Sequence, residues 1–230
     1  MRPFFAVLAF AGLLSSHPAT AQNGPVVVEL YTSQGCSSCP PADALLHDLG
    51  NRDDVIALAL HVDYWDYIGW ADSFAQPAFT ARQHAYARAR NAEMVFTPQM
   101  IINGQDSVVA SRAMQVVDAI QAHRAKGNAV QVSMQRNGES VTINATPTAR
   151  GDYLVQLVRY TPSETVQIRR GENAGHAYNY AHIVNAWNVI HRWDGADALA
   201  IEVSAAGTDP AVAIIQHANN GAIVGAAELR

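Results

Sequence analysis

The chain of 230 residues contains two cysteines, and they lie three positions apart in Cys36-Ser37-Ser38-Cys39. Two thiols at this spacing can form a disulfide, exchange it with another thiol, or bind a soft metal ion. A purely structural bridge would close a very small loop and contribute only about 2 kcal/mol, against about 3 kcal/mol for a loop of 15 residues. The spacing therefore favours redox chemistry or metal binding.

The N-terminus has the features of a secretory signal peptide. Arg2 supplies a positive charge, residues 4–14 are apolar, and Ala19-Thr20-Ala21 has the small-x-small pattern that precedes cleavage. The apolar run is shorter than the roughly 20 residues that a transmembrane helix needs. We expect a signal peptide over residues 1–21, with a retained anchor as the alternative. The mature chain is then periplasmic or secreted, without a membrane span, in an oxidising compartment.

The composition narrows the classes of partner. The net charge is −5, and no run of Lys or Arg is present that would follow a phosphate backbone. We therefore expect no binding of nucleic acid. No organic cofactor is expected either, and the sequence leaves the oligomeric state open.

The first half of the mature chain alternates between strand and helix patterns. Residues 26–31 are apolar apart from Glu29 and predict a buried strand, residues 42–49 have helical spacing, and residues 55–62 predict a second strand. Two such strands around one helix indicate a parallel βαβ unit. A second helix is expected from Pro77 to Arg90.

A β-hairpin and a third helix complete this half. Thr97-Pro98 precedes a predicted strand over residues 99–103, Asn103-Gly104 is a turn signal, and residues 107–110 form the return strand. Ser111 is the expected N-cap of a helix that ends at Gly127. The order β-α-β-α-β-β-α predicts an α/β domain over residues 22–127.

The pattern changes after Gly127. Alternating apolar and polar residues flank the turn signal Asn137-Gly138, and further strands are expected at residues 153–160, 165–169, 178–190, 198–204, 211–217 and 222–229. No helix is predicted. Residues 128–230 therefore suggest a second, all-β domain with a sandwich-like architecture.

The strand, the Cys-x-x-Cys pair, the helix and the Thr-Pro before a hairpin together resemble the thioredoxin superfamily. More closely, Glu29 to Asp43, His61-Val62-Asp63-Tyr64-Trp65, Thr97-Pro98-Gln99-Met100 and Arg170 to Gly175 resemble a family of uncharacterised exported bacterial proteins with a thioredoxin-like fold. The resemblance covers nearly the whole mature chain. It implies an α/β thioredoxin-like domain followed by the β-rich region, and it implies little about activity.

The resemblance also implies roles for single residues. Pro98 is expected to be cis, and the backbone of Thr97 to bind the substrate chain. Glu29 occupies, with an offset of one residue, the place of a buried acid that takes a proton from the inner cysteine. The alternative for Glu29 is an edge-strand side chain that reaches solvent.

A helix N-terminus lowers the pKa of a nearby thiol, so Cys36 is the expected exposed nucleophile and Cys39 the resolving thiol. Two departures from the thioredoxin pattern bear on this expectation. Gly35 stands where thioredoxins carry an aromatic residue, and Pro40 and Pro41 follow the second cysteine. Because Pro suits only the first turn of a helix, the helix is expected to start near Pro40, with Cys36 in the preceding loop.

The strand over residues 55–62 leads into an aromatic segment. Since ligands bind at the carboxyl ends of parallel strands, Tyr64 and Trp65 are candidates for one wall of a substrate groove. His61 and Asp63 are candidates for metal binding or proton transfer. The alternative is that the aromatic residues only cover the core. A later loop around Arg170 and Asn173 suggests a docking surface, a ligand site or a structural loop with paired charges, and we favour the structural loop.

Three functions are consistent with these patterns. The first is a thiol–disulfide oxidoreductase that acts through Cys36 and Cys39 on a protein or small thiol substrate. The second is a protein that handles Cu(I) or another metal with Cys36, Cys39 and His61. The third is a binding module on a redox-inert thioredoxin scaffold.

Overall fold

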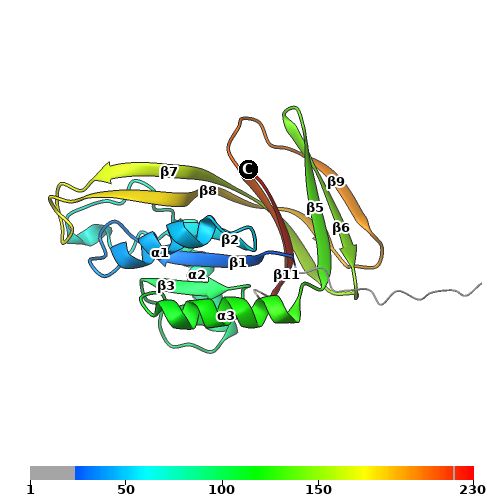
Figure 1. Ribbon diagram of the computed structural model, residues 1–230, viewed down its shortest axis with the longest axis horizontal. Coiled ribbons are helices and arrows are strands. Elements are labelled where there is room, and N and C mark those ends of the chain that lie inside the picture. Colours follow the sequence, from blue (N-terminus) through cyan, green and yellow to red (C-terminus); the bar gives the residue numbers. More distant parts are fainter. Residues whose placement is uncertain (1–23, 220) are drawn as a thin grey trace, which may run out of the picture.

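The computed structural model describes residues 24–219 and 221–230 (Figure 1). The predicted signal peptide over residues 1–21 therefore lies outside the described residues. No helix in the described part of the chain is both long and apolar enough to span a membrane.

The protein is a mixed α/β structure with a large sheet and few helices. The helical segments are α1 (Pro40–Gly50), η1 (Asp66–Ile68), α2 (Pro77–Ala89) and α3 (Ala113–Lys126). The strands are β1 (Val26–Thr32), β2 (Val55–His61), β3 (Gln99–Ile102), β4 (Asp106–Val109), β5 (Val130–Asn137), β6 (Ser140–Pro147), β7 (Tyr153–Gln167), β8 (Ala177–Trp193), β9 (Leu199–Ser204), β10 (Ala211–His217) and β11 (Ile223–Leu229).

The predicted elements of the first half are present in the predicted order. β1 and β2 are parallel, and β3 pairs antiparallel with β1 and with β4. Helix α1 begins at Pro40 with Cys39 as its N-cap, which confirms that Cys36 lies in the loop ahead of the helix. The predicted Ser111 cap of α3 is wrong by one residue, since Arg112 is the N-cap and makes no side-chain capping bond.

The strands after residue 127 belong to two sheets. β5, β6 and β9 form a small sheet, whereas β7, β8, β10 and β11 join the first-half strands in one sheet of order β11-β10-β7-β8-β2-β1-β3-β4. The link is the parallel pairing of β2 with β8, where Ala59 faces Ile183. The described residues beyond 127 contain no helix, as expected. The large sheet combines strands from before and after residue 127, so it does not show the expected separate all-β domain. The domain boundary at residue 127 stays a prediction.

The layers follow from the alternation of side chains along β1. Val28 and Leu30 face α1 and α3, whereas Val27 and Tyr31 face α2 and the β7–β8 side of the core. The small sheet stands at one end of the molecule beside β11 and crosses the direction of the long strands (Figure 1). Val130, Val155 and Ile215 belong to the core that joins the two sheets.

Asn103 ties β1 to β11 at the turn that the sequence predicted. Its backbone has a φ of 45°, its side-chain oxygen accepts a 2.7 Å hydrogen bond from the amide of Val27, and its carbonyl accepts one from Ile223. The residue is buried. We expect Asn103→Ala to lower the free energy of unfolding by roughly 2–3 kcal/mol in urea denaturation, because a buried N–H loses its partner and Ala disfavours the left-handed region.

Asn103→Gly is the control for this effect. Glycine adopts a positive φ freely, so this variant should lose less stability than the alanine variant although it also lacks the hydrogen bond. Equal unfolding midpoints for Asn103→Ala and the wild type would contradict the expectation.

Candidate functional site

The disulfide joins Cys36 to Cys39 at the point where β1 ends and α1 begins. The S–S distance is 2.03 Å, and the amide of Cys39 donates to the carbonyl of Cys36 across the loop. Cys36 is 1% exposed and Cys39 is fully buried, whereas Ser37 and Ser38 are exposed. The expectation of an exposed Cys36 is therefore wrong for the oxidised protein.

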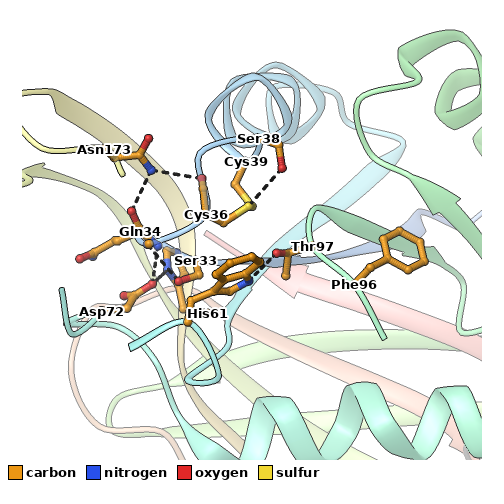
Figure 2. Close-up of a disulfide and its surroundings, with 12 residues drawn as sticks. Ser33, Gln34, Cys36, Ser38, Cys39, His61, Asp72, Phe96, Thr97 and Asn173 are labelled. Atoms are coloured by element: carbon orange, nitrogen blue, oxygen red, sulfur yellow. Dashed lines mark hydrogen bonds and ion pairs between the residues drawn. A yellow bond between two sulfur atoms is a disulfide. The ribbon is translucent and has the colours of Figure 1, made fainter. Parts of the chain in front are cut away.

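The residues that bury Cys36 come from distant parts of the chain. A Cβ on Gly35 would lie 3.2 Å from both Trp65 and Ile68, so the missing side chain lets this segment lie directly against the disulfide loop. From the other side, the Asn173 amide donates to the carbonyls of Gln34 and Cys36 at 2.9 and 3.1 Å (Figure 2). Position 35 therefore has no room for the aromatic side chain that thioredoxins carry there, because Trp65 and Ile68 occupy the space.

The peptide bond between Thr97 and Pro98 is cis, as the resemblance predicted. Tyr31 near the end of β1 pairs with Gln99, so Thr97 lies just beyond that end, beside the cysteine pair (Figure 2). Its hydroxyl accepts a 2.8 Å hydrogen bond from the Trp65 indole. Thr97, Pro98 and Trp65 therefore meet next to the disulfide.

The aromatic segment after β2 is only partly buried. Tyr67 is 81% exposed and stacks on Trp65 with an interplanar angle of 13°, and Trp65 is half-buried. The Tyr64 hydroxyl donates to Gln83, and burial raises the pKa of Tyr64 to about 12. Tyr67 and Trp65 thus form an aromatic surface beside Thr97, whereas Tyr64 also packs against the core.

A buried polar cluster lies at the carboxyl ends of β1 and β2. The Nδ1 of His61 donates to Asp72 at 2.7 Å, and the same carboxylate oxygen accepts from the Gln34 amide at 2.7 Å. Since a carboxylate only accepts, Nδ1 of His61 carries the proton of this hydrogen bond. His61 and Asp72 have fully buried side chains. Asp63, the other candidate for metal binding or proton transfer, is not part of this cluster and accepts from the Thr80 hydroxyl.

Asp43 is the acid of this cluster that sequence reasoning missed. It lies four residues after Cys39, the N-cap of α1, and its amide donates to the carbonyl of Cys39, so the two residues are on the same side of the first helical turn. Burial raises the pKa of Asp43 to about 7, and the charge of nearby His61 opposes the rise. Among the described residues, Asp43 Oδ2 and His61 Nε2 are buried atoms without a hydrogen-bond partner. No signal in the sequence pointed to Asp43, because an acid in the first turn of a helix is usually an exposed residue.

Glu29 is buried, but its carboxylate does not face the cysteines. Both oxygens are held by Arg82 at 2.7 and 3.0 Å, and the hydroxyls of Tyr31 and Tyr86 donate to it. Glu29 alternates with Val28 and Leu30 along β1, which places it on the α2 side of the sheet. The alternative of a solvent-exposed side chain is wrong.

The metal alternative required Cys36, Cys39 and His61 to converge. The described residues contain no group of three or more His, Cys, Asp or Glu side chains arranged to hold a metal ion. In this structure the two sulfurs bond to each other, and His61 bonds to Asp72. The structure therefore does not bring the predicted ligands together.

Comparison with known proteins places the chain in a group whose activity is undescribed. A family model described as "Protein of unknown function (DUF1223)" matches residues 27–216. The chain is similar to a crystal structure of a protein from Agrobacterium tumefaciens, solved as a structural-genomics target, with 34% identity and a TM-score of 0.79. The match covers 91% of this chain and 96% of that one. No curated protein matches.

Proposed function

We propose, for a chain that belongs to the DUF1223 family of proteins of unknown function, that the Cys36–Cys39 pair is a redox centre that exchanges its disulfide with a substrate thiol. The substrate is a thiol of an exported protein or a small organic thiol, and the site works in the periplasm or outside the cell. The fold around the site is a thioredoxin-like arrangement.

One juxtaposition carries this proposal. The disulfide lies between a strand and a helix N-terminus, and the Thr97-Pro98 segment lies beside it, just beyond the carboxyl end of β1. Strand ends of this kind hold ligand sites in α/β proteins. In this proposal the backbone of Thr97 binds an extended chain, and the aromatic surface of Tyr67 and Trp65, whose indole bonds to the Thr97 hydroxyl, lies beside it.

The exchange uses only groups of this chain and the substrate. A substrate thiolate attacks Cys36 Sγ, the Cys36–Cys39 bond breaks, and Cys39 leaves as a thiolate that takes up a proton. A second substrate thiolate then attacks the mixed disulfide and releases the Cys36 thiolate. The substrate is oxidised by two electrons, and the protein disulfide is reduced by the same two.

We assign the acid–base role beside Cys39 to Asp43 rather than to Glu29. The Glu29 carboxylate is paired with Arg82, whereas Asp43 Oδ2 has no hydrogen-bond partner and Asp43 lies in the first turn of α1, four residues after the N-cap Cys39. A carboxyl group with a pKa near 7 can both give and take a proton at neutral pH.

The test is equilibration of the protein with glutathione buffers, followed by transfer of its disulfide to a reduced, unfolded protein. We expect a reduction potential above about −300 mV and oxidation of the substrate. Cys36→Ser should abolish the redox equilibrium with glutathione and the oxidation of the substrate, because no mixed disulfide forms at the attacked sulfur. Cys39→Ser should retain Cys36 and trap a mixed disulfide. A potential far below about −300 mV without exchange would reject the proposal.

The burial of both sulfurs favours one second candidate, a redox-inert binding module. In that case the disulfide only holds the loop before α1. The same glutathione equilibration separates the two functions, because the binding module would stay oxidised and would transfer no disulfide.

A further inference from the structure

The loop between β7 and β8 contacts the disulfide loop although more than a hundred residues separate them in the sequence. It is closed on itself by hydrogen bonds from Ile168 to the carbonyl of His176 and from Gly175 to that of Ile168, each 2.9 Å long. Gly171 has a φ of +79°, and a Cβ there would lie 3.3 Å from Trp70. The loop is thus a defined structure packed against the segment that follows β2.

Asn173 makes the connection between this loop, residues 168–176, and the disulfide. Its side chain is buried, and its amide nitrogen donates to the carbonyls of both Gln34 and Cys36 (Figure 2). These two carbonyls flank Gly35 in the turn that presents Cys36. One amide group therefore holds both sides of the turn in the conformation that leaves Cys36 1% exposed.

We propose that Asn173 is a positioning residue that limits access to Cys36, so that the disulfide reacts only when the loop 168–176 moves away from the turn. The biological meaning of this inference rests on the proposed function. Its test does not, because reduction by an added dithiol can be measured whatever the natural substrate is. A thiolate must approach Cys36 Sγ in line with the S–S bond, and a buried sulfur denies this path.

The choice of residue supports a positioning role. Asn supplies two N–H donors on one nitrogen, and both are used on carbonyl oxygens. An aspartate of the same shape cannot donate when ionised, and it would place a negative charge against two carbonyl oxygens. Asn173→Asp should therefore release the turn at least as fully as Asn173→Ala.

The experiment measures the rate at which dithiothreitol, and separately a reduced protein dithiol, reduces the oxidised full-length protein. In this reaction the reagent loses two electrons, and Cys36 and Cys39 become thiols. Loss of two hydrogen bonds should raise the open population, and hence the rate, by about tenfold, equal to about 1.4 kcal/mol. The rate of reduction by the protein dithiol should rise by a larger factor than the rate with dithiothreitol, because the larger reagent needs a wider opening of the loop.

Asn188→Ala is the matched control, because Asn188 is exposed on β8 and is not part of the loop. A purely structural role for Asn173 would lower the unfolding midpoint without changing the ratio of the two reduction rates. Unchanged rates and an unchanged ratio in Asn173→Ala and Asn173→Asp would overturn the inference.

A measurement on the wild type keeps the inference testable if the variants do not fold. Hydrogen exchange at the Gly175 amide reports how often the loop opens. Reduction no faster than this opening supports the inference, and reduction faster than the opening refutes it. Failure of the proposed function looks different, because Asn173→Ala would then be reduced quickly yet oxidise no substrate protein.

Discussion

The Arg82→Met variant is expected to lose about 3–5 kcal/mol of its free energy of unfolding, because it leaves the Glu29 carboxylate buried without a counter-charge. The Glu29 side chain is fully buried and that of Arg82 is 11% exposed. Arg82 also donates to Tyr86 and Gln216, and its guanidinium lies 3.8 Å from the ring centre of Trp187. This one side chain therefore connects β1, α2, β8 and β10. Urea denaturation at neutral pH measures the loss.

Two controls separate the charge from the lost volume. Arg88→Met changes an exposed arginine on the same helix and should leave stability within about 0.5 kcal/mol. The double variant Glu29→Gln with Arg82→Met removes both charges and should recover a large part of the loss. If it is as unstable as Arg82→Met alone, the buried charge is not the cause.

The Asp43→Asn variant is expected to be more stable than the wild type at pH 8, by up to roughly 4 kcal/mol. Burial holds the pKa of Asp43 at about 7 in the folded protein, against 3.8 for the ordinary group. Between these values the unfolded chain has released the proton while the folded protein retains it. The wild type therefore loses this stability as the pH rises from about 4 to 7, and the amide variant does not.

The measurement is urea denaturation of the wild type and the variant between pH 4 and pH 8. The two proteins should converge near pH 4, and only their difference is assigned to Asp43, because His61, Asp72 and Tyr180 also face this cluster. Asp48→Asn is the matched control, since Asp48 lies on the same helix and is 80% exposed. A pH-independent difference between wild type and Asp43→Asn would contradict the assignment.

Asp43 lowers the stability of the folded protein at neutral pH, which suggests that it is present for a functional reason. Perturbed acids gather at functional sites, and one in the first helical turn after Cys39 is suited to exchange a proton with that thiol. Asp43→Asn should therefore also flatten the pH profile of disulfide exchange near pH 7. An unaltered profile would remove Asp43 from the reaction and leave it as a structural acid.

Local patterns in the sequence were sufficient for the first half of the fold. The alternation and helical spacing of apolar residues predicted β1, α1, β2 and the β3–β4 hairpin, and Pro40 predicted the start of α1. Alternating residues and turn signals likewise predicted most of the strands beyond residue 127, but the two strands expected at residues 153–160 and 165–169 are one strand, β7. These features depend on residues close in sequence, so the sequence alone contains them.

Only the tertiary structure decided the surroundings of the cysteine pair and the way the two halves join. Asn173 lies 137 residues from Cys36, and Arg82 lies 53 residues from Glu29. The pairing of Ala59 with Ile183 makes one sheet of strands that the sequence divides between two regions. Side-chain period shows which face of an element is buried but not which distant segment covers it, so the sequence located the disulfide, whereas long-range packing decided its exposure.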